Sequence, residues 1–345
     1  MQADIQCEVM NSPVEQHPID LDVCCFSSVN IHPEKSLLSV ESGLPEIVGP
    51  GSRLSFAPLS MERIEEYSSL FSRCAEKASD YSFINIWGWS EERKYEWAFQ
   101  DDLCWLRLTG GPQPVYWAPV GNWDRPDWAE VLARTVAPGT AFQRTPETLA
   151  NLWQTQLQGR VVLEDQRSEW EYLYDYKTMV SLAGNKMHKK KNLLNQFKKL
   201  YDYTYAPICA KRIGLIRDMQ QVWCEWRGCE ESPGLVAENI AIARVLDQWE
   251  NLPGILGGSL SVDDKTIAYT VAEDLGDGTV VIHFEKGLDS YKGVYQAINQ
   301  IFLANTPGFQ IVNREQDMGS PGIRQAKESY NPAGFLKKYT VRWLG

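Results

Sequence analysis

The sequence has 345 residues and a formal net charge of -11, and 43% of its residues are hydrophobic. This length and apolar content predict two domains with sizeable cores. The acidic balance argues against a protein that coats nucleic acid, because such a protein needs a broad basic face, but it allows a small basic pocket for one phosphorylated ligand.

Residues 1–52 contain five prolines and little hydrophobic periodicity, which predicts a weakly ordered N-terminal extension. The first residues lack a basic segment followed by an apolar one, and no run of about 18 apolar residues occurs, so we expect neither a secretory signal nor a membrane-spanning helix. The eight cysteines are scattered without a zinc-binding spacing. We therefore expect a cytoplasmic protein with reduced cysteines.

The next part of the chain predicts a helix, three strands, two more helices and a strand. Apolar residues recur at helical spacing over 60–77, with Ser60 as N-cap. Strands are predicted at 95–99, 103–108 and 114–120. Helices are predicted to begin near Pro126 and at Thr145, and a buried strand is predicted at 160–164.

The second half predicts a longer series in a similar order. The predicted elements are a helix at 187–200, a strand at 203–208, helices at 213–227 and 235–251, strands at 255–262, 266–274 and 279–285, a helix at 292–304, a strand at 309–312, a helix at 323–329 and a strand-like C-terminus. Strand, two helices, three meandering strands, helix, strand, helix, strand resembles the GNAT-type N-acyltransferase fold, and the first half resembles a shorter copy.

This order predicts an α/β (α+β) protein with tandem GNAT-like acyl-CoA N-acyltransferase domains. Each domain should have a mixed, mostly antiparallel sheet flanked by helices. We place the extension at 1–52, the first domain at 53–165, and the second domain, which carries the ligand site, at 166–345.

The turn before the helix at 292–304 is the predicted cofactor-binding site. In GNAT-type folds, backbone N–H groups at this helix start hold the ligand's pyrophosphate. Its residues here are Ser290, Tyr291, Lys292 and Gly293. The usual loop has Gln or Arg first and Gly or Ala last, whereas Ser290 and Tyr295 take those places, and a tyrosine would crowd a pyrophosphate. An ordinary strand-to-helix turn is the alternative.

Polar residues follow the predicted strand at 309–312, where open sheets bind ligands. We predict Asn313 and Arg314 as substrate-binding residues, and Glu315 and Asp317 as catalytic groups that hold an acceptor amine. Tyr330 is the candidate general acid. The alternative is a surface salt-bridge network of little energetic value.

The stretch "INIWGW", 84–89, offers Trp87 as a substrate-binding residue, with burial in the core as the alternative. A second candidate comes from the lysine-rich helix at 187–200. At about 100 degrees per residue, most of its lysines fall on a solvated face, but Lys186 and Lys190 fall inside the apolar arc. We expect both to meet a ligand phosphate or carboxylate between the domains; a buried salt bridge is the alternative.

Four stretches together carry a family resemblance: "DYSFINIWGW", "KMHKKKNLLNQF", "IHFEKGLDSYKGVYQAINQ" and "VNREQDMGSPGIRQAKESYNPAGFLKKY". They resemble a bacterial family of unknown function that is grouped with the C-terminal domain of phosphatidylglycerol lysyltransferase and is distantly similar to the Fem aminoacyl transferases. The resemblance covers about residues 53–345.

The resemblance implies an acyl- or aminoacyltransferase that moves a group from a CoA ester or aminoacyl-tRNA to an amine or hydroxyl. It implies no permanently bound cofactor and no metal. The expected partners are a small-molecule or aminoacylated donor and tRNA, without DNA or a membrane span. A non-catalytic GNAT-like sensor protein is the alternative function.

Overall fold

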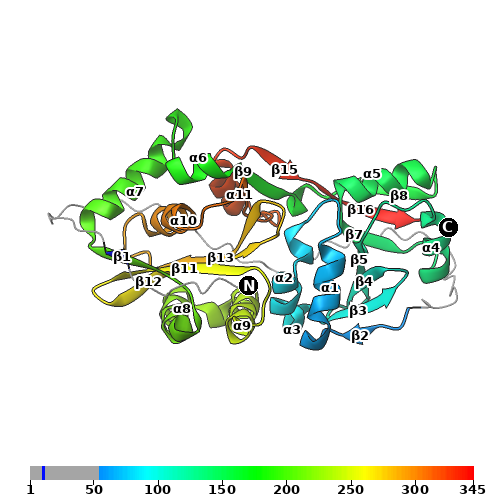
Figure 1. Cartoon of the computed structure of the whole chain (residues 1–345), viewed down its shortest axis with the longest axis horizontal. Helices are drawn as coiled ribbons and strands as arrows, with labels where there is room; N and C mark the ends of the chain where they lie inside the picture. The colour runs from blue at the N-terminus through cyan, green and yellow to red at the C-terminus, as the bar shows by residue number, and fades with distance from the viewer. Residues whose placement is uncertain (1–9, 12–53) are drawn as a thin grey trace.

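The computed structural model describes residues 10–11 and 54–345. The predicted extension at 1–52 therefore lies outside the described residues, except for Met10–Asn11. In the described part, the chain forms two eight-stranded sheets, one in each half of the molecule, with helices packed against them (Figure 1).

Both sheets are antiparallel except for one parallel strand pair each, β5 with β7 and β13 with β14. The first sheet contains, in spatial order, β2 (Ala57–Pro58), β3 (Tyr95–Gln100), β4 (Leu103–Leu108), β5 (Val115–Trp117), β7 (Ala141–Pro146), β16 (Lys338–Trp343) and β8 (Val161–Asp165), with β6 (Val120–Gly121) beside β4. The second contains β1 (Met10–Asn11), β10 (Tyr203–Pro207), β11 (Ile255–Val262), β12 (Lys265–Asp274), β13 (Thr279–Gly287), β14 (Ile311–Asn313), β9 (Glu171–Asp175) and β15 (Gly334–Leu336).

Helices cover both faces of the second sheet, with α7 and α10 on one side and α8 and α9 on the other (Figure 1). Seven consecutive residues of β12, 267–273, are buried as a result. The helices of the first half are α1 (Ile64–Phe71), α2 (Phe83–Gly88), α3 (Ser90–Arg93), α4 (Trp128–Thr135) and α5 (Glu147–Gln156). Those of the second half are α6 (Tyr176–Ser181), α7 (His188–Leu200), α8 (Ile213–Arg227), α9 (Pro233–Asp247), α10 (Val294–Ala304) and α11 (Pro321–Glu328).

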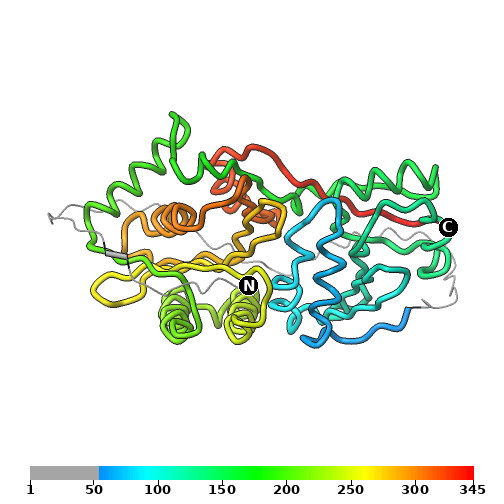
Figure 2. The backbone as a smooth tube through the Cα atoms, viewed as in Figure 1, coloured from blue at the N-terminus to red at the C-terminus, as the bar shows by residue number. Residues whose placement is uncertain are grey.

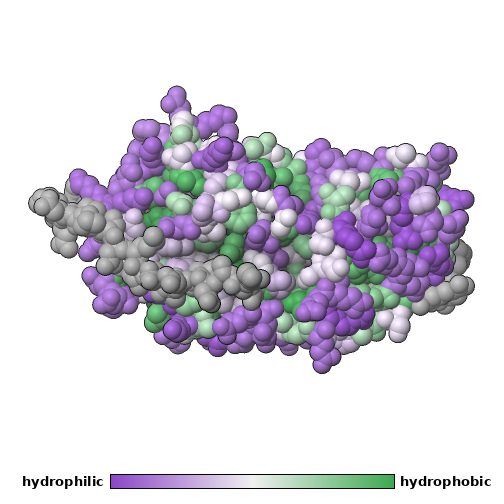
Figure 3. All heavy atoms as spheres, viewed as in Figure 1, coloured by the Kyte–Doolittle hydropathy of each residue, from purple (hydrophilic) through white to green (hydrophobic). Residues whose placement is uncertain are grey.

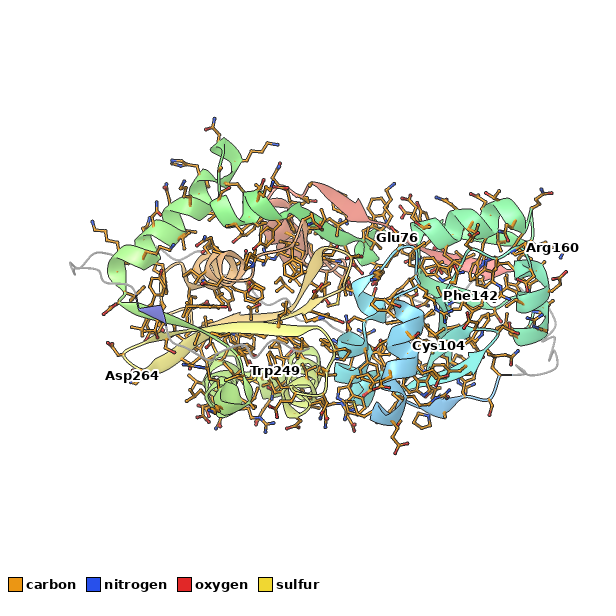
Figure 4. The ribbon with its side chains drawn as sticks, in the orientation of Figure 1. Glu76, Cys104, Phe142, Arg160, Trp249 and Asp264 are labelled. Carbon is orange, nitrogen blue, oxygen red and sulfur yellow. A yellow bond between two sulfur atoms is a disulfide. The ribbon has the colours of Figure 1, made fainter. Side chains whose placement is uncertain are left out.

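The core of the first half continues into the second half beneath α8 and α9. Figure 4 places Cys104 and Phe142 inside the first half, and Trp249 near α9. Helix α2 packs closely on α9, because a Cβ on Gly88 would lie 3.1 Å from the Val245 side chain. The stretch "INIWGW" is therefore mostly a packed helix, which favours the core interpretation for its isoleucines.

One strand of the second half, β16, joins the sheet of the first half. The C-terminal strand β16 pairs antiparallel with β7 and β8 of the first sheet, while β9, which follows β8 in sequence, pairs with β14 and β15 of the second. Figure 2 shows the C-terminal segment running from one half into the other. Strand β16 therefore lies in the first sheet, held by pairing on both sides, although its residues fall within the predicted second domain, 166–345.

Two local predictions also differ from the structure. A helix was predicted to begin at Thr145, but Thr145 lies in strand β7, and helix α5 begins at Glu147. The pairing of β7 with β5 and β16 extends the strand to Pro146. Cys224 and Cys229 form a disulfide, against the expectation of reduced cysteines. The turn after α8 brings their Cα atoms to 4.9 Å, within the range that a disulfide needs.

Candidate functional site

The candidate site lies where the parallel strands β13 and β14 diverge, and we call it the β13–β14 junction. The two strands pair only over residues 279–281 and 311–313. Beyond that point β13 stays with β12 up to Gly287, while the chain after β14 follows β9, through hydrogen bonds from Arg314 N to Tyr172 O and from Tyr172 N to Glu315 O. Ligands of open sheets bind at the carboxyl ends of such diverging strands.

A β-bulge at His283 lies in this junction. Val271 of β12 pairs with Phe284 and Ala272 pairs with Ile282, so His283 is the extra residue of β13. Bulges redirect side chains and are frequent beside functional sites. Here the bulge places His283 and Glu285 on opposite sides of the junction, where each meets a residue that follows β14.

His283 bridges two carboxylates on one side of the junction. Its Nε2 lies 2.8 Å from Glu273 Oε2, and its Nδ1 lies 3.0 Å from Glu315 Oε1. Asn85 of α2 donates a hydrogen bond of 3.1 Å to the same Glu315 oxygen. Burial opposes protonation, but the two carboxylates prevail and raise the pKa of His283 to about 9. The imidazole is therefore charged at neutral pH and joins β12, β13 and the segment after β14.

The backbone of Glu315 makes this bridge possible. Its φ of 56° is in the left-handed region, which is uncommon for a residue other than glycine. Its N–H donates to the side chain of Asn313 at 2.8 Å, which stabilises the sharp turn. Unusual backbone conformations of this kind often occur at functional sites.

Arg314 forms the bridge on the other side of the junction. Its guanidinium donates to Glu285 at 3.3 Å and stacks 4.9 Å from the centroid of the Tyr330 ring. Asn299 of α10 donates to the other Glu285 oxygen at 2.8 Å. Two predicted site residues, Arg314 and Tyr330, are thus in contact, and Lys190 of α7 lies against the same ring at 4.4 Å.

Asp317 is fully buried and surrounded by donors. It accepts hydrogen bonds from Arg324 at 2.8 Å, Tyr172 at 2.7 Å and the Gly319 N–H at 2.8 Å. Burial alone would raise the pKa of Asp317, but these hydrogen bonds hold it below its ordinary value. The carboxylate therefore fastens the segment after β14 to α11 and β9, and has little capacity to accept a proton.

Asn313 belongs to a buried charge network at the crossing between the halves. Its amide donates to Glu171, and Glu171 also accepts from Lys338 at 3.0 Å and from the Ser79 N–H at 3.0 Å. Lys338 pairs in addition with Asp80. Asn313 is thus buried and links the junction, through Glu171, to Lys338 of β16. It is not an exposed group.

The predicted phosphate-binding turn packs against α7. Tyr201 accepts the Lys292 N–H at its hydroxyl, 3.1 Å away, and its ring packs on Tyr291. Gly293 has a φ of 81°, and a Cβ there would overlap the carbonyl oxygen of Leu193. Ser290 is exposed beside this turn. The Lys292 N–H, in the turn before α10, is therefore already occupied by a protein acceptor.

The prediction that Lys186 points toward the core is wrong. Lys186 lies in a 3-10 turn, Asn185–Met187, that precedes α7, so the angular spacing of an α-helix does not apply to it. Its side chain is exposed and donates to Asn331 at 2.7 Å. Lys190 does face the protein, but it meets Tyr330 within the second half, not a space between the halves.

Trp87 contacts none of the other predicted site residues. Its ring stacks on Phe83 and lies 4.5 Å from the Arg244 guanidinium of α9. The contact of this helix with the β13–β14 junction comes instead from Asn85, which donates to Glu315.

Sequence reasoning did not select several groups of the junction: Asn85, Glu273, His283, Glu285 and Lys327. His283 is buried and paired with two carboxylates. The bulge that positions it has no sequence signal, because it depends on pairing with β12. Among residues 54–345, no three His, Cys, Asp or Glu side chains are arranged to hold a metal ion. The described helices are all too short or too polar to cross a membrane.

Comparison with protein families matches residues 71–342 to the family described as phosphatidylglycerol lysyltransferase, C-terminal. An uncharacterized protein of Mycoplasmoides gallisepticum is 28% identical over 181 residues, which are 51% of this chain. The match spans only 56% of the length of that relative.

Three solved structures are similar in fold. A conserved protein of unknown function from Bacteroides thetaiotaomicron has a TM-score of 0.76 and 28% identity, covering 84% of this chain and 99% of that one. L-PGS from Bacillus licheniformis has a TM-score of 0.58 and 13% identity, covering 86% and 94%. The C-terminal domain of a putative lysylphosphatidylglycerol synthetase from Agrobacterium fabrum has a TM-score of 0.56 and 14% identity, covering 83% and 93%. With the two-sheet topology, these matches confirm the predicted tandem GNAT-like fold.

Proposed function

The chain belongs to the family of the C-terminal domain of phosphatidylglycerol lysyltransferase, and we propose that it transfers an aminoacyl or acyl group from an activated donor to an amine or hydroxyl. The observation that carries the proposal is the pair of charged bridges at the β13–β14 junction, His283–Glu315 and Arg314–Glu285. The proposal includes a cytoplasmic location, because aminoacyl-tRNA and acyl-CoA are both made there.

Attack of an amine or hydroxyl on an ester needs positioning, a proton acceptor and a positive group near the developing oxyanion. Arg314 is the best-placed cation, since its guanidinium is largely buried between Glu285 and Tyr330. A charge so shielded from water acts strongly on a nearby oxyanion. Glu285 can position an incoming amine by accepting hydrogen bonds from it, with Asn299 holding its other oxygen.

Two observations favour aminoacyl-tRNA over a CoA ester as the donor. First, α7 and the turn before it expose Lys186, Lys189, Lys191 and Lys199, and none of these makes an ion pair with a carboxylate in the described part of the chain. Figure 3 shows hydrophilic side chains along this edge of the molecule, at the upper left. Such a local excess of positive charge attracts a polyanion, even on an acidic protein.

Second, the helix start that would hold the pyrophosphate of CoA is partly occupied. The Tyr201 hydroxyl takes the Lys292 N–H, and the α7 backbone lies against Gly293. A donor that binds through a phosphodiester backbone on α7 does not need these groups. A CoA ester does need them, because its pyrophosphate requires free backbone donors.

A second candidate function is binding of the donor without turnover. It is favoured by the same two bridges, because a ligand that enters between β13 and β14 has to displace contacts that already satisfy the charges. A sensor could use this displacement as its response.

The test is a transfer assay with radiolabelled aminoacyl-tRNAs and acyl-CoAs against a mixture of amine and hydroxyl acceptors. We expect label to move from an aminoacyl-tRNA, and Arg314→Met to lower turnover at least about 100-fold. Arg160→Met is the matched control, because Arg160 is exposed in the first half, and it should retain activity.

Binding with a salt-dependent affinity but no transfer would favour the sensor. Transfer from a CoA ester alone would exclude the tRNA donor. Neither binding nor transfer with any donor would refute the proposal as a whole.

A further inference from the structure

Lys327 is a half-buried lysine of α11 that faces the segment after β14. It lies one helical turn before Tyr330. Its ammonium donates to the carbonyl of Gln316, and it lies 5.8 Å from the centroid of the Tyr172 ring. The Tyr174 hydroxyl donates to the Lys327 carbonyl at 2.8 Å, which fixes this end of α11 on strand β9.

The charged groups that face Lys327 are Glu315, Arg314 and Asp317 of the segment after β14, and Glu171 of β9. In the described part of the chain, no carboxylate pairs with its ammonium. Each nearby acid is engaged elsewhere: Glu315 with His283, Asp317 with Arg324, and Glu171 with Lys338.

A lysine in this setting exists partly as the free amine at neutral pH. Burial lowers the pKa of Lys327 to about 7, although Glu315 favours the charged form. The other candidate proton acceptors at the junction are less suitable. Both nitrogens of the charged His283 are hydrogen-bonded, and Asp317 is held ionised by its donors.

We propose that Lys327, as a neutral amine, is the base that accepts the proton of the acceptor; this inference rests on the proposed transferase function. The acceptor nitrogen or oxygen forms a bond to the donor carbonyl carbon, and its proton passes to Nζ of Lys327. The bond from that carbon to the ribose oxygen of the donor breaks. The Lys327 ammonium then returns the proton to the leaving oxygen, so the enzyme ends in its starting state.

The first experiment needs no substrate. Wild-type protein is acetylated with trace acetic anhydride between pH 5 and pH 10.5, and the modification of each lysine is measured by peptide mass spectrometry. Lys265, exposed at the start of β12, is the control. We expect the midpoint of Lys327 reactivity near pH 7, well below that of the control. Equal midpoints would overturn the inference, and so would failure to label Lys327, because a base must be reachable by an amine.

The second experiment compares Lys327→Met, Lys327→Arg and Lys265→Met in the transfer assay. Both Lys327 variants should lower kcat about 100- to 10,000-fold, with little change in KM, and should abolish the rise of kcat around pH 7. Arginine keeps the charge but cannot accept a proton, so activity in Lys327→Arg would show a purely electrostatic role and refute the inference. Circular dichroism confirms that each variant is folded.

The two failures are distinguishable. Full activity in Lys327→Met refutes the base but leaves the transferase function standing. Absence of transfer by the wild type removes the transferase function, and with it the role of Lys327, whatever its titration midpoint.

Discussion

The ammonium nitrogen of Lys190 lies 4.4 Å from the centroid of the Tyr330 ring, and the Arg314 guanidinium lies 4.9 Å from the same centroid. Two cations from distant parts of the chain therefore meet one buried phenol ring beside the β13–β14 junction. Such contacts are worth more when they are shielded from water. Lys190 therefore differs from the neighbouring lysines, Lys189 and Lys191, whose side chains are exposed.

We predict that Lys190→Ala weakens donor binding far more than Lys199→Ala. Lys190 supports the ring that borders Arg314, whereas Lys199 is exposed at the far end of α7 and contributes only to the general positive field. Binding of labelled aminoacyl-tRNA at fixed salt measures both variants. Equal losses of affinity would contradict the prediction.

Protonation of His283 should stabilise the fold. Its pKa is raised to about 9 in the folded protein, against about 6.5 when unfolded, so the contribution is complete below about pH 6.5 and is lost as the pH rises through 9. The difference corresponds to about 3 kcal/mol. We expect the melting temperature of wild type to fall over this range relative to His283→Gln. Parallel pH profiles for the two proteins would show that His283 does not titrate there.

Lys338→Met should destabilise the protein strongly. The side chain is fully buried, and its loss leaves Asp80 and Glu171 without their shared cation. Removing one partner of a buried ion pair costs about 3–5 kcal/mol. Guanidinium unfolding measures the loss, with Lys337→Met as control, because the ion pair of the neighbouring Lys337 with Glu147 lies at the surface. Similar unfolding midpoints for the two variants would argue against the buried network.

Gly293→Ala should be more harmful than Gly308→Ala. Both glycines have positive φ, so both variants bear a conformational cost of about 1–2 kcal/mol. Only at position 293 would the new Cβ overlap the α7 backbone, which adds about 1–3 kcal/mol. Thermal unfolding compares the two. If Gly308→Ala is equally destabilised, α7 does not pack on this turn as described.

Much of the second half could be predicted from hydrophobic periodicity. The predicted helix at 213–227 and the strand at 255–262 have the bounds of α8 and β11, because each is a long element with a clear pattern. Strand β9 was not predicted. It is short, and its pairing partners β14 and β15 are more than a hundred residues away in sequence.

For the candidate site, too, the sequence predicted the segment but not the contacts of its side chains. The polar run from Asn313 to Asp317 was predicted because it follows a strand, and the structure places it beside the β13–β14 junction. The separate position of each side chain could not be predicted, because the left-handed backbone of Glu315 turns its carboxylate toward His283, while Arg314 faces Glu285. Asp317 was expected to be catalytic, but four donors surround it, and two of them, Arg167 and Tyr172, are distant in the sequence.

The sequence by itself determined the two-domain α+β class, most long elements and the polar segment after β14, because these depend on periodicity and turn chemistry within short windows. Only the tertiary structure decided that β16 joins the first sheet, that a bulge brings His283 to Glu315, and that Lys190 rather than Lys186 faces inward. These features depend on pairing between residues far apart in the chain, for which the local sequence carries no signal.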